Sequence, residues 1–330
     1  MAAITASQSH HSQIRPFDVR RDLTGVADLI ETCFSQTLDV DGRRYLGQMR
    51  EAARGKGFNR WVSLAASSST LPLAGFVWVE AGKVVGNLSM VPFFSQGRRI
   101  YLIANVAVYP EYRRRGIAKA LTEAALKKSR QRQVQATWLQ VRDDNTAAIE
   151  LYQKMGFTPR ARRTTWNANP EFPRRTFSAV GSSELPRFTR VAYRRARYWP
   201  AQKNWLGLNY PPTLRWHFSL KLQAMKPGLW GWLNKIFTET DVRHWAVERE
   251  NELLGVITWQ ASGGQYDRLW LAAPPENEAE TLRAVIPYMV SQGRMIKPFS
   301  LDYPVDRARE TLLSLGFKPK QTLIWMESKT

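Results

Sequence analysis

Two segments of the chain share one pattern, and this repeat constrains the fold more than any other feature. Thr146–Met155 reads as a helix that ends at Gly156-Phe157, and Val305–Leu315 reads as a helix that ends at Gly316-Phe317. Each predicted helix follows one strand and precedes another. We infer a tandem duplication in which the second copy has diverged, so that the 330 residues form two domains.

The order of the predicted elements agrees with this duplication. Residues 14–166 read β, α, α, β, β, β, α, β, α, β, and residues 186–330 repeat the later part of that order. Such an order predicts an α/β chain in which sheets carry helices on their faces. We expect residues 1–13 to be a disordered lead-in. Residues 167–185, which are rich in Pro, Arg and Ser, are the predicted linker.

Composition excludes several classes of protein. The single cysteine, Cys33, lies in an apolar helical pattern and is expected to be a small buried hydrophobe, so an intrachain disulfide is excluded and a cytoplasmic location fits. The four histidines are scattered, which predicts no metal site. No apolar run reaches the roughly 18 residues that a spanning helix needs, and the N-terminus lacks the pattern of a secretory signal.

A basic turn that contains a glycine is the strongest candidate site. The run Arg113-Arg114-Arg115-Gly116-Ile117-Ala118 follows a predicted strand, Arg99–Val108, and opens a predicted helix at about Gly116–Gln131. The first N–H groups of a helix have no partner within the helix, and the helix dipole adds positive charge there. Gly116 lets a phosphate approach the backbone closely. The turn therefore predicts an anion site.

The pattern Arg113-x-x-Gly116-x-Ala118 resembles motif A of the GNAT N-acetyltransferases, which is [Gln/Arg]-x-x-Gly-x-[Gly/Ala]. The stretch Leu139–Phe157 is similar to motif B of the same superfamily, with an Asn and a Tyr ahead of Gly-Phe. The resemblance covers residues 14–166 well and the second half in outline. It implies two tandem GNAT-like domains, each a mixed, mostly antiparallel sheet flanked by helices, with the catalytic domain at residues 14–166 and a degenerate copy at residues 186–330.

The resemblance also implies a reaction. Acetyl-CoA would be the co-substrate, without a metal, and a neutral primary amine would attack its thioester directly. A backbone N–H near Val108 would stabilise the tetrahedral oxyanion, and Tyr152 would protonate the departing CoA thiolate. The residues that the resemblance assigns to the co-substrate are Val106, Ala107, Val108, Arg113, Arg114, Arg115, Gly116, Ile117, Ala118, Lys119 and Asn145.

The residues themselves leave alternatives open. Asn145 and Tyr152 are seven positions apart and share a helix face, yet Asn145 could be an N-cap and Tyr152 a core aromatic. The general base is unassigned because the strand Tyr101–Val108 carries no carboxylate. Glu80 could substitute for it, although an exposed strand carboxylate is the simpler interpretation, and an ordered water would also serve.

The second copy departs from the pattern. In place of a phosphate turn it has Ala273–Glu280, with no glycine, two prolines that remove backbone donors, and three glutamates that would repel CoA. We predict that this copy does not bind acetyl-CoA. It could complete an acceptor cleft, shield the first domain, or serve as a purely structural partner.

The net charge of +20 is expected to serve solubility and attraction for polyanionic CoA. The alternative is a non-catalytic module that uses a GNAT scaffold to bind nucleic acid or protein. The stretch Arg187–Arg215 interleaves arginines with aromatics, but we interpret it as a solvated face over a core, and Leu229–Leu233 as interior rather than membrane-facing. The acceptor, a small-molecule or peptide amine, the acyl length and the choice between monomer and homodimer stay open.

Overall fold

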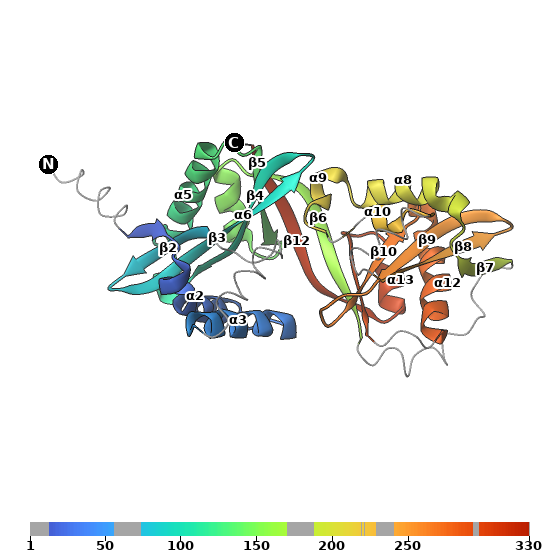
Figure 1. The fold of residues 1–330 in the computed structure, drawn as a ribbon, viewed down its shortest axis with the longest axis horizontal. Helices are drawn as coiled ribbons and strands as arrows, with labels where there is room; N and C mark the ends of the chain where they lie inside the picture. The colour runs from blue at the N-terminus through green and yellow to red at the C-terminus, as the bar shows by residue number, and fades with distance from the viewer. Residues whose placement is uncertain are drawn as a thin grey trace. The chain divides into compact units, whose positions relative to one another are not determined.

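The computed structural model describes residues 13–55, 74–169, 188–218, 220, 222–228, 241–292 and 297–329. The chain divides into two compact units (Figure 1). Unit 1 runs to Arg160 and takes in the end of the chain from Ile324 onward, and unit 2 is Ala161–Leu323. The predicted lead-in, apart from Gln13, and the predicted linker, apart from residues 167–169, lie outside the described residues.

Unit 1 is a mixed sheet with helices on both faces. Its strands follow the order β1-β2-β3-β4-β5-β12, and of the pairings described only β4 with β5 is parallel. The elements are β1 (Ile14–Pro16), α2 (Val19–Phe34), α3 (Val40–Ala53), β2 (Ala74–Glu80), β3 (Lys83–Ser95), β4 (Arg98–Val108), α5 (Ile117–Gln131), β5 (Ala136–Arg142) and α6 (Thr146–Lys154), together with the first residues of β6 (Thr158–Ala168) and the last of β12 (Phe317–Lys329).

Two apolar clusters hold these helices against the sheet. Leu23, Val26 and Ile30 recur at helical spacing on α2 and pack with α3 against one face. On the other face, Ile117 and Leu121 of α5 pack beside Val85 and Leu139 of the sheet. Figure 1 shows α5 on the opposite side of the sheet from α2 and α3. Unit 1 is thus a helix–sheet–helix sandwich, which confirms the predicted fold class.

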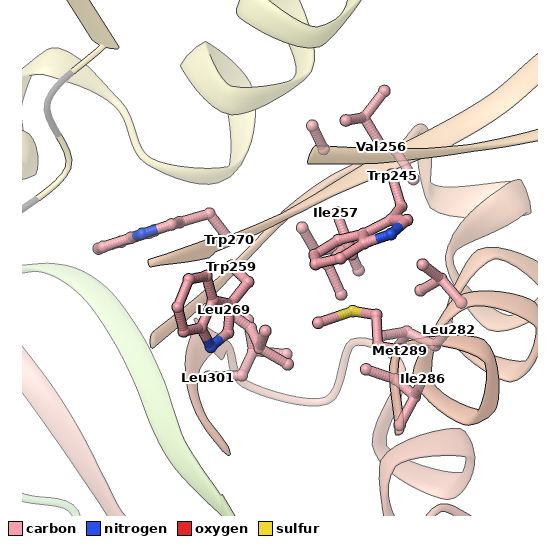
Figure 2. Close-up of a cluster of buried hydrophobic side chains, with 14 of the residues drawn as sticks. Trp245, Val256, Ile257, Trp259, Leu269, Trp270, Leu282, Ile286, Met289 and Leu301 are labelled. Atoms are coloured by element: carbon pink, nitrogen blue, oxygen red, sulfur yellow. The ribbon is translucent and has the colours of Figure 1, made fainter. Parts of the chain in front are cut away.

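Unit 2 has the same plan, with strand order β12-β6-β11-β10-β9-β8-β7. A single large core lies between β8, β9, β10 and α12, where Trp245, Ile257 and Met289 face one another (Figure 2). Its elements are β7 (Thr189–Tyr193), α8 (Trp199–Asn209), α9 (Pro212–Arg215), α10 (Leu222–Met225), β8 (Val242–Arg249), β9 (Glu252–Gln260), β10 (Asp267–Ala272), α12 (Glu278–Ser291), β11 (Phe299–Pro304) and α13 (Arg309–Ser314), with most of β6 and β12.

The last strand of the chain completes unit 1. Met326 on β12 is fully buried in the same cluster as Tyr152, and the backbone carbonyl of Glu327 accepts a hydrogen bond from Thr158 Oγ1 at 3.2 Å. The Glu327 carboxylate accepts a second one from Arg160 Nε at 2.8 Å. The observed division therefore differs from the sequence-based boundaries: residues 161–166 belong to unit 2, and the end of the chain belongs to unit 1.

Candidate active site

The strands β4 and β5 pair in parallel and then separate. Their described pairing runs from Ile100↔Ala136 to Ile103↔Leu139 and goes no further. At this point β4 has a bulge, in which Asn105 adopts a φ of 50°. A bulge bends its strand locally, and asparagine tolerates the left-handed region better than most residues. The stretch 104–108 of β4 is therefore directed away from β5.

A buried asparagine on the neighbouring strand supports the bulge. Asn87 Nδ2 donates a hydrogen bond to the backbone carbonyl of Asn105 at 2.9 Å. Because Asn87 is almost fully buried, this bond satisfies a donor that would otherwise be costly to bury. This pair was not predicted from the sequence, where its only signal is two amides inside largely apolar strands.

The predicted anion turn has the backbone geometry of a donor cradle. Arg114 and Gly116 have φ values of 63° and 77°, and the first N–H within helical bonding is that of Ala120, which donates to the Gly116 carbonyl. The backbone N–H groups of residues 114–119 donate no hydrogen bond to any described residue. Successive unpaired N–H groups at a helix start form a concave anion site.

Gly116 serves this turn through its backbone conformation. A Cβ at this position would meet no atom within 4 Å, so crowding does not require glycine there. Glycine is required by the left-handed φ of 77°, because this conformation strains residues that carry a side chain. A different glycine fixes the helix behind the turn: a Cβ at Gly86 on β3 would lie 2.8 Å from Ile117 Cγ2. Gly86 thus lets the first turn of α5 approach the sheet.

The basic side chains of the turn divide into anchored and free ones. Arg113 Nε donates to the backbone carbonyl of Val108 at 3.1 Å, which closes the loop between β4 and α5. Lys119 lies 3.8 Å from Glu123, an exposed pair of little energetic value. Arg114 is exposed and forms no ion pair with any described residue.

Glu80 anchors the third arginine. One of its carboxylate oxygens, Oε1, accepts hydrogen bonds from Arg115 Nη2 at 2.8 Å and from Trp78 Nε1 at 3.0 Å. Glu80 is half-buried rather than exposed, which differs from the simpler sequence interpretation. Its two donors leave it poorly placed to accept a proton from a substrate amine.

Tyr152 and Asn145 occupy different environments. Tyr152 is only 6% exposed and belongs to the apolar cluster against which Val106 and Val108 pack. Its ring lies edge-on to Phe157, with 5.9 Å between centroids, and burial raises the pKa of its phenol to about 12. Asn145 is exposed, and its Oδ1 accepts from Ala148 N at 3.2 Å. Asn145 is therefore the N-cap of α6.

Cys33 is closer to this site than its sequence pattern predicted. It is half-buried, and its Sγ donates to the backbone carbonyl of Val108 at 3.3 Å, beside Arg113. Burial raises the pKa of the thiol, so Cys33 is a neutral thiol at physiological pH.

In unit 2 the corresponding helix start is filled by side chains of the unit itself. Glu278, the first residue of α12, is buried and forms an ion pair with Arg307 and a hydrogen bond with Tyr303. A carboxylate thus occupies the positive end of the helix dipole, where the turn of unit 1 has unpaired N–H groups.

The strand separation of unit 2 is also filled. The described pairing of β10 with β11 ends at Leu269↔Leu301. Beyond it, Asn209 Nδ2 donates to the Leu271 carbonyl on β10 and to Tyr303 Oη on β11, each at 3.0 Å. Asn209 is 1% exposed. It therefore closes the edge that stays free on β4 of unit 1.

The basic and aromatic stretch of unit 2, interpreted as a solvated face over a core, has side chains in both environments. Arg190, Arg195 and Arg197 are exposed. Tyr198 is buried in the core, with Trp199 and Trp205 packed against it, although Phe188 and Tyr193 are exposed. Arg187 and Leu229–Leu233 lie outside the described residues.

The described part of the chain contains no group of three or more His, Cys, Asp and Glu residues that could hold a metal ion. No helix in it is long and apolar enough to cross a membrane.

Residues 50–157 match the model of the acetyltransferase (GNAT) family. Unit 1 is a GNAT acetyltransferase domain. Its matched range includes β4, the turn, Asn145 and Tyr152. The recognition of the superfamily from its two motifs is thus confirmed.

Curated relatives of this domain are N-acetyltransferases or acetyltransferases by name. The [ribosomal protein bS18]-alanine N-acetyltransferase of Escherichia coli strain K12 is 45% identical over 53 residues, which are 16% of this chain and 36% of that protein. The mycothiol acetyltransferase of Kocuria rhizophila is 30% identical over 147 residues, 44% of this chain and 45% of that protein. The chain thus spans less than half the length of each of these two relatives.

A solved tandem GNAT protein from the clavulanic acid biosynthesis pathway has the same fold over nearly its whole length. The TM-score is 0.51 at 14% identity, and the match covers 96% of this chain and 98% of that one. The predicted tandem arrangement of two GNAT-like folds is therefore confirmed at the level of the fold.

Proposed function

We propose that unit 1 transfers an acetyl group from acetyl-CoA directly to a primary amine. The observation that carries this proposal is the turn before α5, with its run of unpaired N–H groups at residues 114–119. A pyrophosphate needs several donors in a concave arrangement together with positive charge. The turn supplies both, and the exposed side chain of Arg114 adds a positive charge.

The free edge of β4 fits the next part of the same molecule. An extended pantetheine chain carries amide groups, and the separated stretch 104–108 offers a strand edge without a β5 partner. Val106, Ala107 and Val108 would hold the pantetheine there. Acetyl-CoA, when bound, supplies an activated thioester carbonyl for the amine to attack.

Tyr152 is the proposed general acid. When the amine nitrogen bonds to the acyl carbon, the carbon–sulfur bond breaks and the sulfur needs a proton. A phenol whose pKa is about 12 keeps its proton at physiological pH and can give it to a thiolate as the negative charge develops. The buried position of the ring fixes its orientation.

The charge that develops on the acyl oxygen needs a backbone donor. Tyr109 N–H is already used, since it donates to the Val85 carbonyl at 3.1 Å. The N–H of Val108 or of its neighbours on β4 therefore remains the proposed donor. Because Glu80 is held by Arg115 and Trp78, we assign removal of the amine proton to an ordered water rather than to Glu80.

We further propose a single acetyl-CoA site in each chain. In unit 2, Glu278 and Arg307 fill the helix start and Asn209 closes the strand edge. Release of Glu278 would leave the Arg307 charge unpaired, and release of Asn209 would leave buried polar groups unsatisfied. Unit 2 thus does not bind acetyl-CoA. In unit 1, Asn145 acts by ordering the start of α6.

The acceptor is a small-molecule or peptide amine. The curated relatives include one enzyme named for an alanine of a ribosomal protein and one named for mycothiol, so both kinds of acceptor occur among them. The test is acetyl-CoA-dependent thiol release over a panel of amines that includes peptides with a free N-terminus. Turnover of at least one amine supports the proposal. Acetyl-CoA binding without turnover of any amine would favour the non-catalytic module.

A further inference from the structure

A cavity of about 440 Å³ lies on unit 1, between the second half of α5 and the sheet. Aromatic and apolar side chains line it, among them Phe76 of β2, Met90 of β3 and Tyr101 of β4. Two lysines of α5, Lys127 and Lys128, line it as well. None of the residues assigned to acetyl-CoA lines this cavity, since those of α5 lie in its first turn.

Basic side chains continue from the rim of this cavity. We name Arg98, Arg99, Lys127, Lys128, Arg130 and Arg132 the α5 basic patch. The Arg99 carbonyl accepts a hydrogen bond from Gln135 N at 2.9 Å, which joins the start of β4 to the segment that follows α5. Five of the six side chains are exposed, and Lys128 is half-buried.

The charge of the patch is not compensated. Within the described residues, none of its six side chains forms an ion pair. Between Arg98 and Arg142 the sequence has only two acidic residues, Glu111 and Glu123, and the second of these lies beside Lys119. Lys128 and Arg130 lie in the last turn of α5, where the negative end of the helix dipole favours cations. This effect does not explain the arginines on the β3–β4 hairpin.

An exposed aromatic ring lies next to the patch. Phe94, on the hairpin between β3 and β4, is 67% exposed. The guanidinium of Arg99 lies 5.8 Å from the centre of its ring. An arginine over an exposed ring leaves the other face of the ring open, which is the arrangement on which a base can stack.

We propose that this surface binds single-stranded nucleic acid, with a base in the cavity and the phosphates along the α5 basic patch. A single strand of nucleic acid presents flat bases and negatively charged phosphates. Its bases stack on aromatic side chains and its phosphates bind cations, and this surface has both. An anionic membrane would require a wide apolar face, whereas Phe94 is the one exposed large apolar side chain beside this patch among the described residues. The proposal is independent of acetyl transfer, because the patch lies at the opposite end of α5 from the proposed acetyl-CoA turn.

The test is the fluorescence anisotropy of a labelled oligouridine titrated with the full chain over a range of salt. We expect saturable binding. The logarithm of the association constant should fall linearly with the logarithm of the salt concentration, with a slope of about −0.7 for each phosphate contacted. The double variant Lys127→Glu/Lys128→Glu should bind at least about 10-fold more weakly. The variant Tyr101→Leu should lose about 5- to 100-fold, from lost stacking.

The matched control places the same charge change on exposed residues of unit 2, in Arg283→Glu/Lys318→Glu. It should bind oligouridine within about 2-fold of the wild type. An unchanged circular-dichroism spectrum and unfolding midpoint show that each variant is folded, and Lys127→Gln/Lys128→Gln replaces the charge reversal if that variant does not fold. No binding at low salt, equal losses in the patch and control variants, or full affinity in Tyr101→Leu would each overturn the proposal.

Discussion

Glu80 and Arg115 lie 2.8 Å apart and join the end of β2 to the turn before α5. The same carboxylate oxygen also accepts a hydrogen bond from Trp78 Nε1, so Glu80 anchors the turn to β2. This role predicts that Glu80→Gln keeps kcat within about 3-fold of the wild type and raises KM for acetyl-CoA modestly, because a partly exposed ion pair is worth little. A general base would instead cost about 100-fold or more in kcat. Steady-state kinetics with a saturating amine separates the two outcomes.

Tyr152→Phe should lower kcat by about 10²- to 10⁴-fold and leave the affinity for acetyl-CoA unchanged. The phenyl ring can keep its packing against Phe157, so the fold should persist. Tyr288→Phe, at a half-buried tyrosine of unit 2, is the matched control and should have normal kcat. If both variants turn over at the wild-type rate, Tyr152 is a core aromatic only.

The pH dependence of kcat follows from the raised pKa of Tyr152. Its proton donor is present below a pKa of about 12 and is lost only as pH rises through that value. Tyr152 should therefore produce no fall in kcat between about pH 6 and pH 10. A basic limb in this range that disappears in Tyr152→Phe would mean that the phenol titrates far lower than its burial implies.

Gly116→Ala should weaken acetyl-CoA binding because alanine disfavours the φ of 77° on which the donor cradle depends. Gly97 is a matched control, since its φ is 76° and a Cβ there also meets nothing within 4 Å. Both variants should lose a similar stability, of about 1 kcal/mol. Only Gly116→Ala should lose affinity in calorimetric titration with acetyl-CoA, and equal affinities would remove the turn from the site.

Met326→Ala should destabilise unit 1 by about 2–5 kcal/mol, because it empties a fully buried position of that core. Leu313→Ala, at a side chain that is 44% exposed, should cost less than about 1 kcal/mol. Urea unfolding with acetyl-CoA binding as the reporter measures the difference. Equal costs would show that the end of the chain does not support the catalytic domain.

The sequence was sufficient to predict the turn because its features are local. A glycine with a positive φ, a helix start and a preceding apolar strand all lie within a few residues of Gly116. The N-cap role of Asn145 was recognisable for the same reason, although it could not be separated from a role in binding. The tandem repeat could be inferred from the two Gly-Phe helix ends.

Contacts between residues distant in the sequence could not be predicted. The end of β12 belongs to unit 1 because Met326 fills a core that is built mainly from residues 78–157. The anchoring of Arg115 by Glu80 and the contact of Cys33 with Val108 join residues 35 and 75 positions apart. Periodicity assigns a residue to a face but does not identify its partner there.

The stoichiometry of acetyl-CoA binding tests the central claim most directly. Isothermal titration of the full chain should give one site per chain, and Gly116→Glu should abolish it by placing a carboxylate in the donor cradle. Two sites per chain, or one site that persists in Gly116→Glu, would contradict an account in which unit 1 alone binds acetyl-CoA at the turn before α5.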